Sequence, residues 1–112
     1  MPWTGLPNHL DLTASDLERS IAFYDVLLGR LGYVRDQVYA GNVPAWAWRG
    51  HGPSFSIGLH RAASKQAHDR GAPGFHHLAF HVGSRAEVDA MLRAIAAVAT
   101  RLPAGEALLI DR

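Results

Sequence analysis

The sequence contains no cysteine, no long apolar run and almost no excess charge of either sign. The absence of cysteine excludes disulfide bonds and thiolate metal sites, and it agrees with a reducing, cytoplasmic location. No apolar run approaches the length of a membrane span, and the N-terminal residues do not resemble a secretory signal. The net charge of +1 and the scattered basic residues give no indication of nucleic acid or a membrane surface as a partner.

The chain is short, and it is rich in one reactive side chain. A length of 112 residues gives one domain and no room for two independent cores. Seven of these residues are histidine, the commonest neutral metal ligand and the commonest acid–base group. Three of the histidines lie within six residues, in the segment 76-HHLAFH-81. A site built on imidazole is therefore the first functional hypothesis.

The first half of the chain predicts one helix and four strands. Residues 7–13 alternate between apolar and polar side chains, as in a strand with one buried face. Ser15 as the N-cap, with Glu18 three residues later, predicts the start of a helix over residues 16–31. Glycine-containing turns then separate three further strand-like segments, over residues 33–39, 43–49 and 54–60. Residues 7–61 thus form a first module of the order β-α-β-β-β.

The second half repeats the beginning of this pattern. The segment 76-HHLAFHV-82 aligns with 8-NHLDLTA-14, and Ser84 followed by Glu87 repeats the expected helix start. The apolar residues that follow have helical spacing, which predicts a second helix with a stripe of Val88, Met91, Leu92, Ile95 and Val98 or Ala99.

This second module spans residues 75–112 and is joined to the first by a polar connector over residues 62–74. After its helix only residues 106–110 have the composition of a strand, so two strands of the first module have no counterpart. We expect an α+β fold in which paired βαβββ modules form a curled mixed sheet and the second module is incomplete.

The two stretches "NHLDLTASDLERSIAFYDVLLGRLGY" and "PGFHHLAFHVGSRAEVDAMLRAI" carry a family resemblance. Together they resemble the vicinal oxygen chelate superfamily, which includes glyoxalase I, bleomycin resistance proteins and extradiol dioxygenases. The resemblance covers about residues 7–99, and it makes residues 1–112 a single domain of that type. It implies a barrel that opens around a divalent metal ion, and it implies a homodimer.

The resemblance also implies a set of metal ligands. Ligands in this family come from the first strand of each module, which gives His9 and His77, and from last strands. The last-strand position of the first module falls near Gly58, which has no side chain, and His60 could substitute from the same strand face. The glutamate that the family supplies from the last strand of its second module has no counterpart before the final residues, where only Glu106 and Asp111 carry carboxylates.

Strand alternation brings further groups to the same side. It places His77 and His81 on the concave face, together with His9 and Asp11. Two or three imidazoles and a carboxylate suit Fe, Mn, Ni or Zn as divalent ions, and such an ion would act as a Lewis acid. The candidates for a third ligand are His60, His81 and Asp11, in that order. An ordinary surface histidine remains an equal alternative for His9.

Aromatic side chains suggest where a substrate would bind. Trp46 and Trp48 share one strand face, so they would either line an apolar pocket or pack in the core. With His81 and Asp11 they make up the predicted substrate-binding residues. The resulting hypothesis is a divalent-metal-dependent lyase or dioxygenase acting on a small oxygen-rich substrate. The alternative is a metal-free, antibiotic-type binding protein or a catalytically inactive relative.

Overall fold

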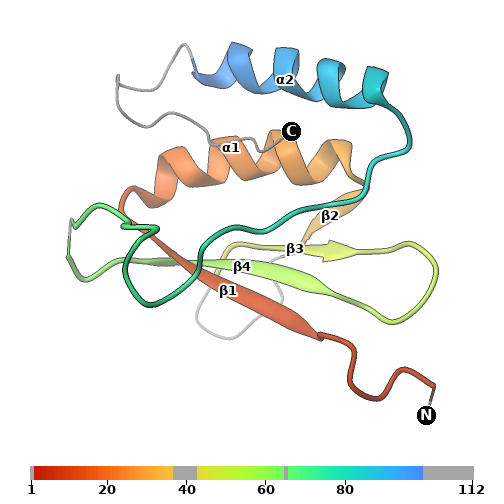
Figure 1. Cartoon of the computed structure of the whole chain (residues 1–112), viewed down its shortest axis with the longest axis horizontal. Helices are drawn as coiled ribbons and strands as arrows, with labels where there is room; N and C mark the ends of the chain where they lie inside the picture. Colours follow the sequence, from red (N-terminus) through yellow and green to blue (C-terminus); the bar gives the residue numbers. More distant parts are fainter. Residues whose placement is uncertain (1, 37–42, 65, 100–112) are drawn as a thin grey trace.

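The computed structural model describes residues 2–36, 43–64 and 66–99. The described chain is an α+β fold in which one mixed four-stranded sheet packs against helices on one side (Figure 1), so the predicted fold class is confirmed. Its elements are β1 (His9–Ala14), α1 (Leu17–Arg30), β2 (Tyr33–Asp36), β3 (Ala45–Trp48), β4 (Ser56–Arg61) and α2 (Arg85–Ala99).

The sheet has the strand order β1-β4-β3-β2. Strand β1 pairs with β4 in parallel, whereas β4 with β3 and β3 with β2 are antiparallel. A parallel pair needs a long crossover, which here consists of α1 and the strands β2 and β3. The first and last strands of the first module therefore become neighbours, and Asp11 lies opposite Gly58.

Helix α1 begins at Leu17, one residue later than predicted. The side chain of Asp16, not that of Ser15, accepts a hydrogen bond from the backbone N–H of Arg19 at 3.3 Å. The carboxylate of Asp16 thus satisfies a backbone donor that the first turn leaves unpaired, so the predicted Ser15 cap is wrong by one position. The helix stops before Gly32, whose φ of 95° is a left-handed conformation that glycine adopts without strain.

The core lies between α1 and the sheet. Leu28 of α1 and Trp46, Ile57 and Leu59 of the sheet are fully buried. Around them pack partly buried side chains from both halves of the chain: Leu12, Leu17, Ile21, Tyr24, Leu27, Leu31, Tyr33, Phe55 and Phe80. Each fully buried large side chain contributes about 1.5–3 kcal/mol to folding. Burial also raises the pKa of the Tyr24 phenol.

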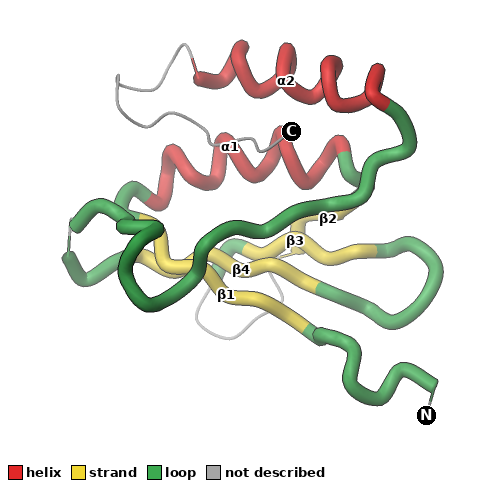
Figure 2. The backbone as a smooth tube through the Cα atoms, viewed as in Figure 1, coloured by secondary structure: helices red, strands yellow, loops and turns green. Residues whose placement is uncertain are grey.

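Helix α2 lies beside α1 rather than on the sheet (Figure 2). It starts after Ser84, whose hydroxyl accepts the N–H of Glu87 at 3.2 Å, while the Glu87 carboxylate accepts the N–H of Gly83 at 2.8 Å. Met91 and Ile95, both in the predicted apolar stripe, are buried. Neither this helix nor α1, the two helices within the described ranges, is long and apolar enough to cross a membrane.

The strand predicted over residues 76–82 is not formed, and that prediction is wrong for the single chain. These residues are extended coil that runs past the sheet toward α2 (Figure 1). A strand requires a neighbour for its backbone N–H and C=O groups. In the first module β4 provides that neighbour for β1, but no described residues of the second module form an equivalent strand. The candidate strand 106–110 lies outside the described residues.

Asp25 of α1 joins the helix to two strands. Its Oδ1 accepts the indole N–H of Trp46 at 2.9 Å, and its Oδ2 accepts a guanidinium N–H of Arg35 at 3.1 Å. The Arg35 guanidinium lies 5.6 Å from the centre of the Trp46 ring, so the three side chains form one cluster. The cluster thus gives a hydrogen-bond acceptor to the indole N–H of Trp46, the largest fully buried side chain in the core.

We expect Asp25→Ala to lower the free energy of unfolding by about 1–2 kcal/mol, because it removes the acceptor for the Trp46 indole N–H. Urea denaturation followed by circular dichroism measures this loss. The matched control is Arg61→Ala, which removes an exposed ion pair with Glu18 and should leave the free energy of unfolding nearly unchanged. Equal losses in the two variants would contradict a specific role for the Asp25–Trp46 hydrogen bond.

Candidate functional site

The sheet has one face turned away from the helices, which we call the free face. Along β1 the side chains alternate, with Leu10 and Leu12 partly buried on the helix side. His9, Asp11 and Thr13 alternate with them and are exposed on the free face. In β4 the same face carries His60, which lies opposite Thr13 in the parallel register. His9, Asp11 and His60 therefore lie on one face of the sheet.

Asp11 and His60 are in direct contact on the free face. Their Oδ2 and Nε2 atoms are 3.2 Å apart, and about half of each side chain is exposed. Gly58 makes this contact possible, because a Cβ at that position would lie only 2.6 Å from Oδ1 of Asp11. The carboxylate thus lies over the backbone of β4 in space that any side chain at position 58 would need.

His9 belongs to the same face but not to this pair. Its Nδ1 lies 2.9 Å from Oδ1 of the neighbouring Asn8, and its side chain is exposed. Within residues 2–36, 43–64 and 66–99 no three His, Asp or Glu side chains gather closely enough to hold a metal ion. The donors expected for a divalent metal therefore do not fit together within one described chain.

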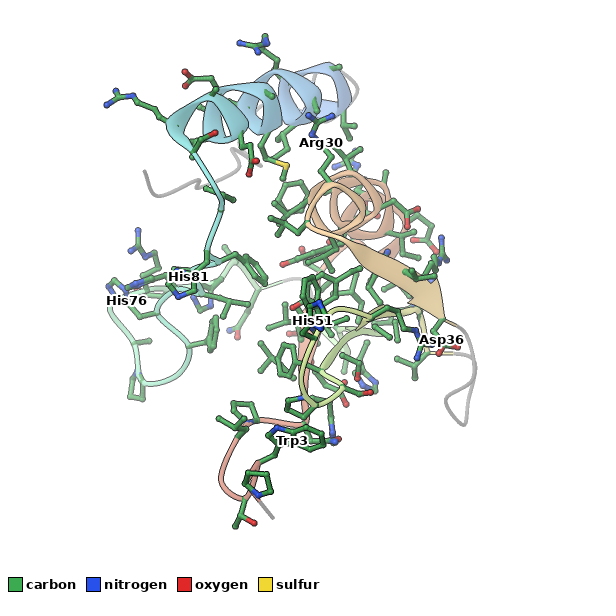
Figure 3. The ribbon with its side chains drawn as sticks, turned by 90° about the vertical axis from the view of Figure 1, so that its right-hand side faces the viewer. Trp3, Arg30, Asp36, His51, His76 and His81 are labelled. Atoms are coloured by element: carbon green, nitrogen blue, oxygen red, sulfur yellow. The ribbon has the colours of Figure 1, made fainter. Side chains whose placement is uncertain are left out.

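His77 lies on the extended 75–82 segment, outside the sheet. Its Nδ1 is 2.8 Å from Nδ1 of His76, and a guanidinium nitrogen of Arg70 is 3.3 Å from the same His76 atom. All three residues are exposed. Figure 3 shows His76 and His81 on one side of the molecule and Asp36 on the other. His76 and His77 thus form a surface group of their own beside the positive charge of Arg70.

Apolar and aromatic side chains surround an open hollow where α1 ends and β2 begins. The hollow has a volume of about 210 Å³ and is lined by Leu31, Tyr33, Trp48, Phe55, Phe80 and His81. We call it the aromatic hollow. The Tyr33 ring centre lies 5.7 Å from that of Trp48 and 6.1 Å from that of Phe80, with tilted and edge-on geometry. These contacts are typical of stable aromatic clusters.

Two features determine the character of this hollow. The Tyr33 phenol is protonated at neutral pH, as tyrosine ordinarily is, so its hydroxyl can donate a hydrogen bond. Partial burial raises its pKa further. Gly50 lies against the indole of Trp48, and a Cβ there would come within 1.9 Å of Cζ2 of that ring. The indole can line the hollow because position 50 has no side chain.

The predicted substrate-binding residues separate into three environments. Trp46 is 1% exposed and packs in the core, so it has no surface to offer a ligand. Trp48 and His81 meet at the aromatic hollow, although they come from different modules. Asp11 lies on the free face beside His60.

Sequence reasoning did not single out Tyr33, Phe55, Phe80 or Gly50 for the hollow. Alternation over residues 54–60 gives Phe55 the same face as Ile57 and Leu59, but no local pattern brings Phe80 to that place. Phe80 reaches it because the 75–82 segment crosses the end of the sheet, which is a tertiary contact.

Comparisons with known proteins find similarity over most of the chain. The family model described as the Glyoxalase/Bleomycin resistance protein/Dioxygenase superfamily matches residues 6–101. The crystal structure of a candidate glyoxalase from Bacillus halodurans is similar with a TM-score of 0.71 and 29% sequence identity. That similarity covers 86% of this chain and 71% of the other. No curated protein matches the sequence.

Proposed function

Because the chain belongs to the glyoxalase/bleomycin resistance protein/dioxygenase superfamily, we propose that it binds a small oxygen-bearing aromatic molecule in the aromatic hollow. The observation that carries this proposal is the hollow itself, which combines aromatic walls with the Tyr33 hydroxyl and the His81 imidazole. Small-molecule sites commonly have apolar walls and a few polar groups that orient the ligand. No metal ion is required for such binding.

The size of the hollow limits the ligand and its affinity. About 210 Å³ accommodates a compound with a single ring. Burying about 100 Å² of apolar ligand surface would contribute about 2.5 kcal/mol. Hydrogen bonds to Tyr33 and His81 add to this, and the loss of ligand freedom offsets part of the gain. We therefore expect a dissociation constant of about 10⁻³ M for simple one-ring probes.

A metal-dependent lyase or dioxygenase is the second candidate. The shared position of His9, Asp11 and His60 on the free face favours it. Its proposed ligands are His9, His60 and His77, and the ion would be Fe, Mn, Ni or Zn in the divalent state. The described residues of one chain do not bring these three donors together, so we assign no reaction step to a metal.

We also propose that the protein forms a homodimer. The 75–82 segment exposes Phe75, Leu78 and Val82, and its backbone makes no ladder with any described strand. An extended segment with unpaired backbone and exposed apolar side chains is suited to association with another chain. A second copy that covers this segment would bury its apolar residues.

We expect catechol, used as a one-ring probe with two adjacent oxygens, to shift the indole N–H signal of Trp48 in ¹H–¹⁵N spectra. The signals of Trp3, at the N-terminal end, and of the buried Trp46 should remain in place. Gly50→Ala should weaken catechol binding by about tenfold, because the added Cβ displaces the Trp48 indole.

The matched control for this experiment is Gly29→Ala, since a Cβ at position 29 meets no other atom within 4 Å. It should bind catechol as the unmodified protein does. A spectrum in which Trp48 is unaffected at millimolar catechol, or in which both variants bind equally, would reject the aromatic hollow as the site.

Metal content separates the two candidate functions. We expect elemental analysis of the purified protein to find well below one equivalent of Fe, Mn, Ni or Zn. One tightly held equivalent that disappears in the double variant His9→Ala, His77→Ala would instead favour the metal-dependent enzyme. The control double variant His51→Ala, His68→Ala removes two exposed histidines that belong to neither proposed site.

Light scattering after size-exclusion chromatography tests the homodimer. We expect a mass of twice one chain, and a monomer for the double variant Leu78→Glu, Val82→Glu, in which charge would be buried at the interface. Leu6→Glu, which alters an exposed leucine outside the 75–82 segment, should remain dimeric. A monomeric unmodified protein at high micromolar concentration would refute the proposal.

A further inference from the structure

Aromatic side chains make up most of the wall of the aromatic hollow. Four of its six lining residues are aromatic, namely Tyr33, Trp48, Phe55 and Phe80. All four are half-buried, so each packs against the protein with one part of its ring and leaves another part open to the hollow. The indole N–H of Trp48 donates to the backbone carbonyl of His51 at 3.5 Å, so its polar atom already has a partner. The hollow therefore offers a ligand mainly aromatic ring surface.

The spacing of these rings suits a cation. A cation is attracted to the face of an aromatic ring when it lies within about 6 Å of the ring centre. Two perpendicular rings can both present a face to one point, about 4.5 Å from each, when their centres are about 6 Å apart. Tyr33 and Phe80 stand at 80° with their centres 6.1 Å apart, and Tyr33 and Trp48 stand at 52° with their centres 5.7 Å apart. These rings thus have the spacing of an aromatic cage.

The charges around the hollow also favour a cation. Among the described residues that line it, none is Arg, Lys, Asp or Glu. The hollow lies at the C-terminal end of α1, where Leu31 is the C-cap and the aligned peptide dipoles leave a partial negative charge. Two arginines are close to it in sequence. The guanidinium group of Arg49 is paired with Asp36 at 3.0 Å, and Figure 3 shows Arg30 beside α2, away from His81.

We propose that the aromatic hollow binds a quaternary ammonium group, such as the trimethylammonium group of choline. Such a group is compact, has no N–H to donate, and is held by aromatic rings through its positive charge. The volume of about 210 Å³ accommodates it. The Tyr33 hydroxyl and the His81 imidazole remain available for an oxygen atom of the same ligand. This ligand class goes beyond the oxygen-bearing aromatic molecule of the proposed function, although it uses the same hollow.

Choline and 3,3-dimethyl-1-butanol are a matched pair of probes, because they have the same shape and differ in the charge of one atom. Each is titrated at constant ionic strength and at about pH 7.5, where imidazole is ordinarily mostly neutral. The indole N–H signal of Trp48 in ¹H–¹⁵N spectra reports binding. We expect choline to bind at least about fivefold more tightly than the alcohol, a ratio that one or two cation–π contacts provide. A purely hydrophobic hollow would instead prefer the alcohol.

Two variants test whether the aromatic rings produce this ratio. Phe80→Leu and Phe55→Leu each keep an apolar side chain and remove one ring of the wall. Choline binding should weaken at least about threefold in each, while binding of the alcohol stays nearly unchanged. Phe23→Leu is the matched control, because it makes the same change on α1 outside the hollow, and it should preserve the ratio. Circular dichroism verifies that every variant is folded.

Equal binding of the two probes, or a preference for choline that survives both Phe80→Leu and Phe55→Leu, would overturn the inference. Catechol titrated into the same protein separates it from the proposed function. If catechol shifts the Trp48 signal and choline has no advantage over the alcohol, only the quaternary ammonium ligand is rejected. If choline is preferred and catechol has no effect, only the oxygen-bearing aromatic ligand is rejected. If neither probe shifts the Trp48 signal, both are rejected.

Discussion

The parallel pairing of β1 with β4 is the contact on which the rest of the structure depends. It joins the beginning of the first module to its end, across a helix and two strands, and so closes a loop of more than forty residues. Closing such a loop costs conformational entropy. The burial of Ile57 and Leu59 under α1 offsets this cost in free energy. The same register then determines which polar side chains meet on the free face. Any other register would move Asp11 away from Gly58 and break its contact with His60.

The local sequence pattern was sufficient to predict the helix and the strands of the first module. The alternation in β1, the helical spacing after Asp16 and the glycine-containing turns each depend on residues close in sequence, and all these elements were found. The cap was misplaced by one residue because both Ser15 and Asp16 are good caps, and only the backbone geometry selects between them. The prediction of a strand over residues 76–82 failed for a different reason. Its side chains have the right alternation, but a strand also needs a partner, and pattern alone does not provide one.

The arrangement of the candidate site residues was predictable only where it follows from strand alternation and register. That His9, Asp11 and His60 share a face follows from alternation in two strands. Their separation into a close pair and a separate histidine does not, because it depends on the backbone space at Gly58. The two tryptophans of β3 likewise have different environments that alternation alone does not predict. Trp46 and Trp48 share a face in sequence, but Trp46 lies under the middle of α1 and Trp48 at the end of the sheet.

The two sides of β4 therefore have separate chemistries on one rigid strand. Phe55, the residue before β4, lines the aromatic hollow on the helix side, and His60 of β4 faces the opposite side beside Asp11. A ligand in the hollow cannot touch the Asp11–His60 pair, because the buried backbone of β4 lies between them. Aromatic side chains and the His81 imidazole thus line the hollow, whereas the Asp11 carboxylate and the His60 imidazole lie together on the free face. In a family that combines binding proteins and metal enzymes, the binding that we propose at the hollow would therefore not require a metal ion on the free face.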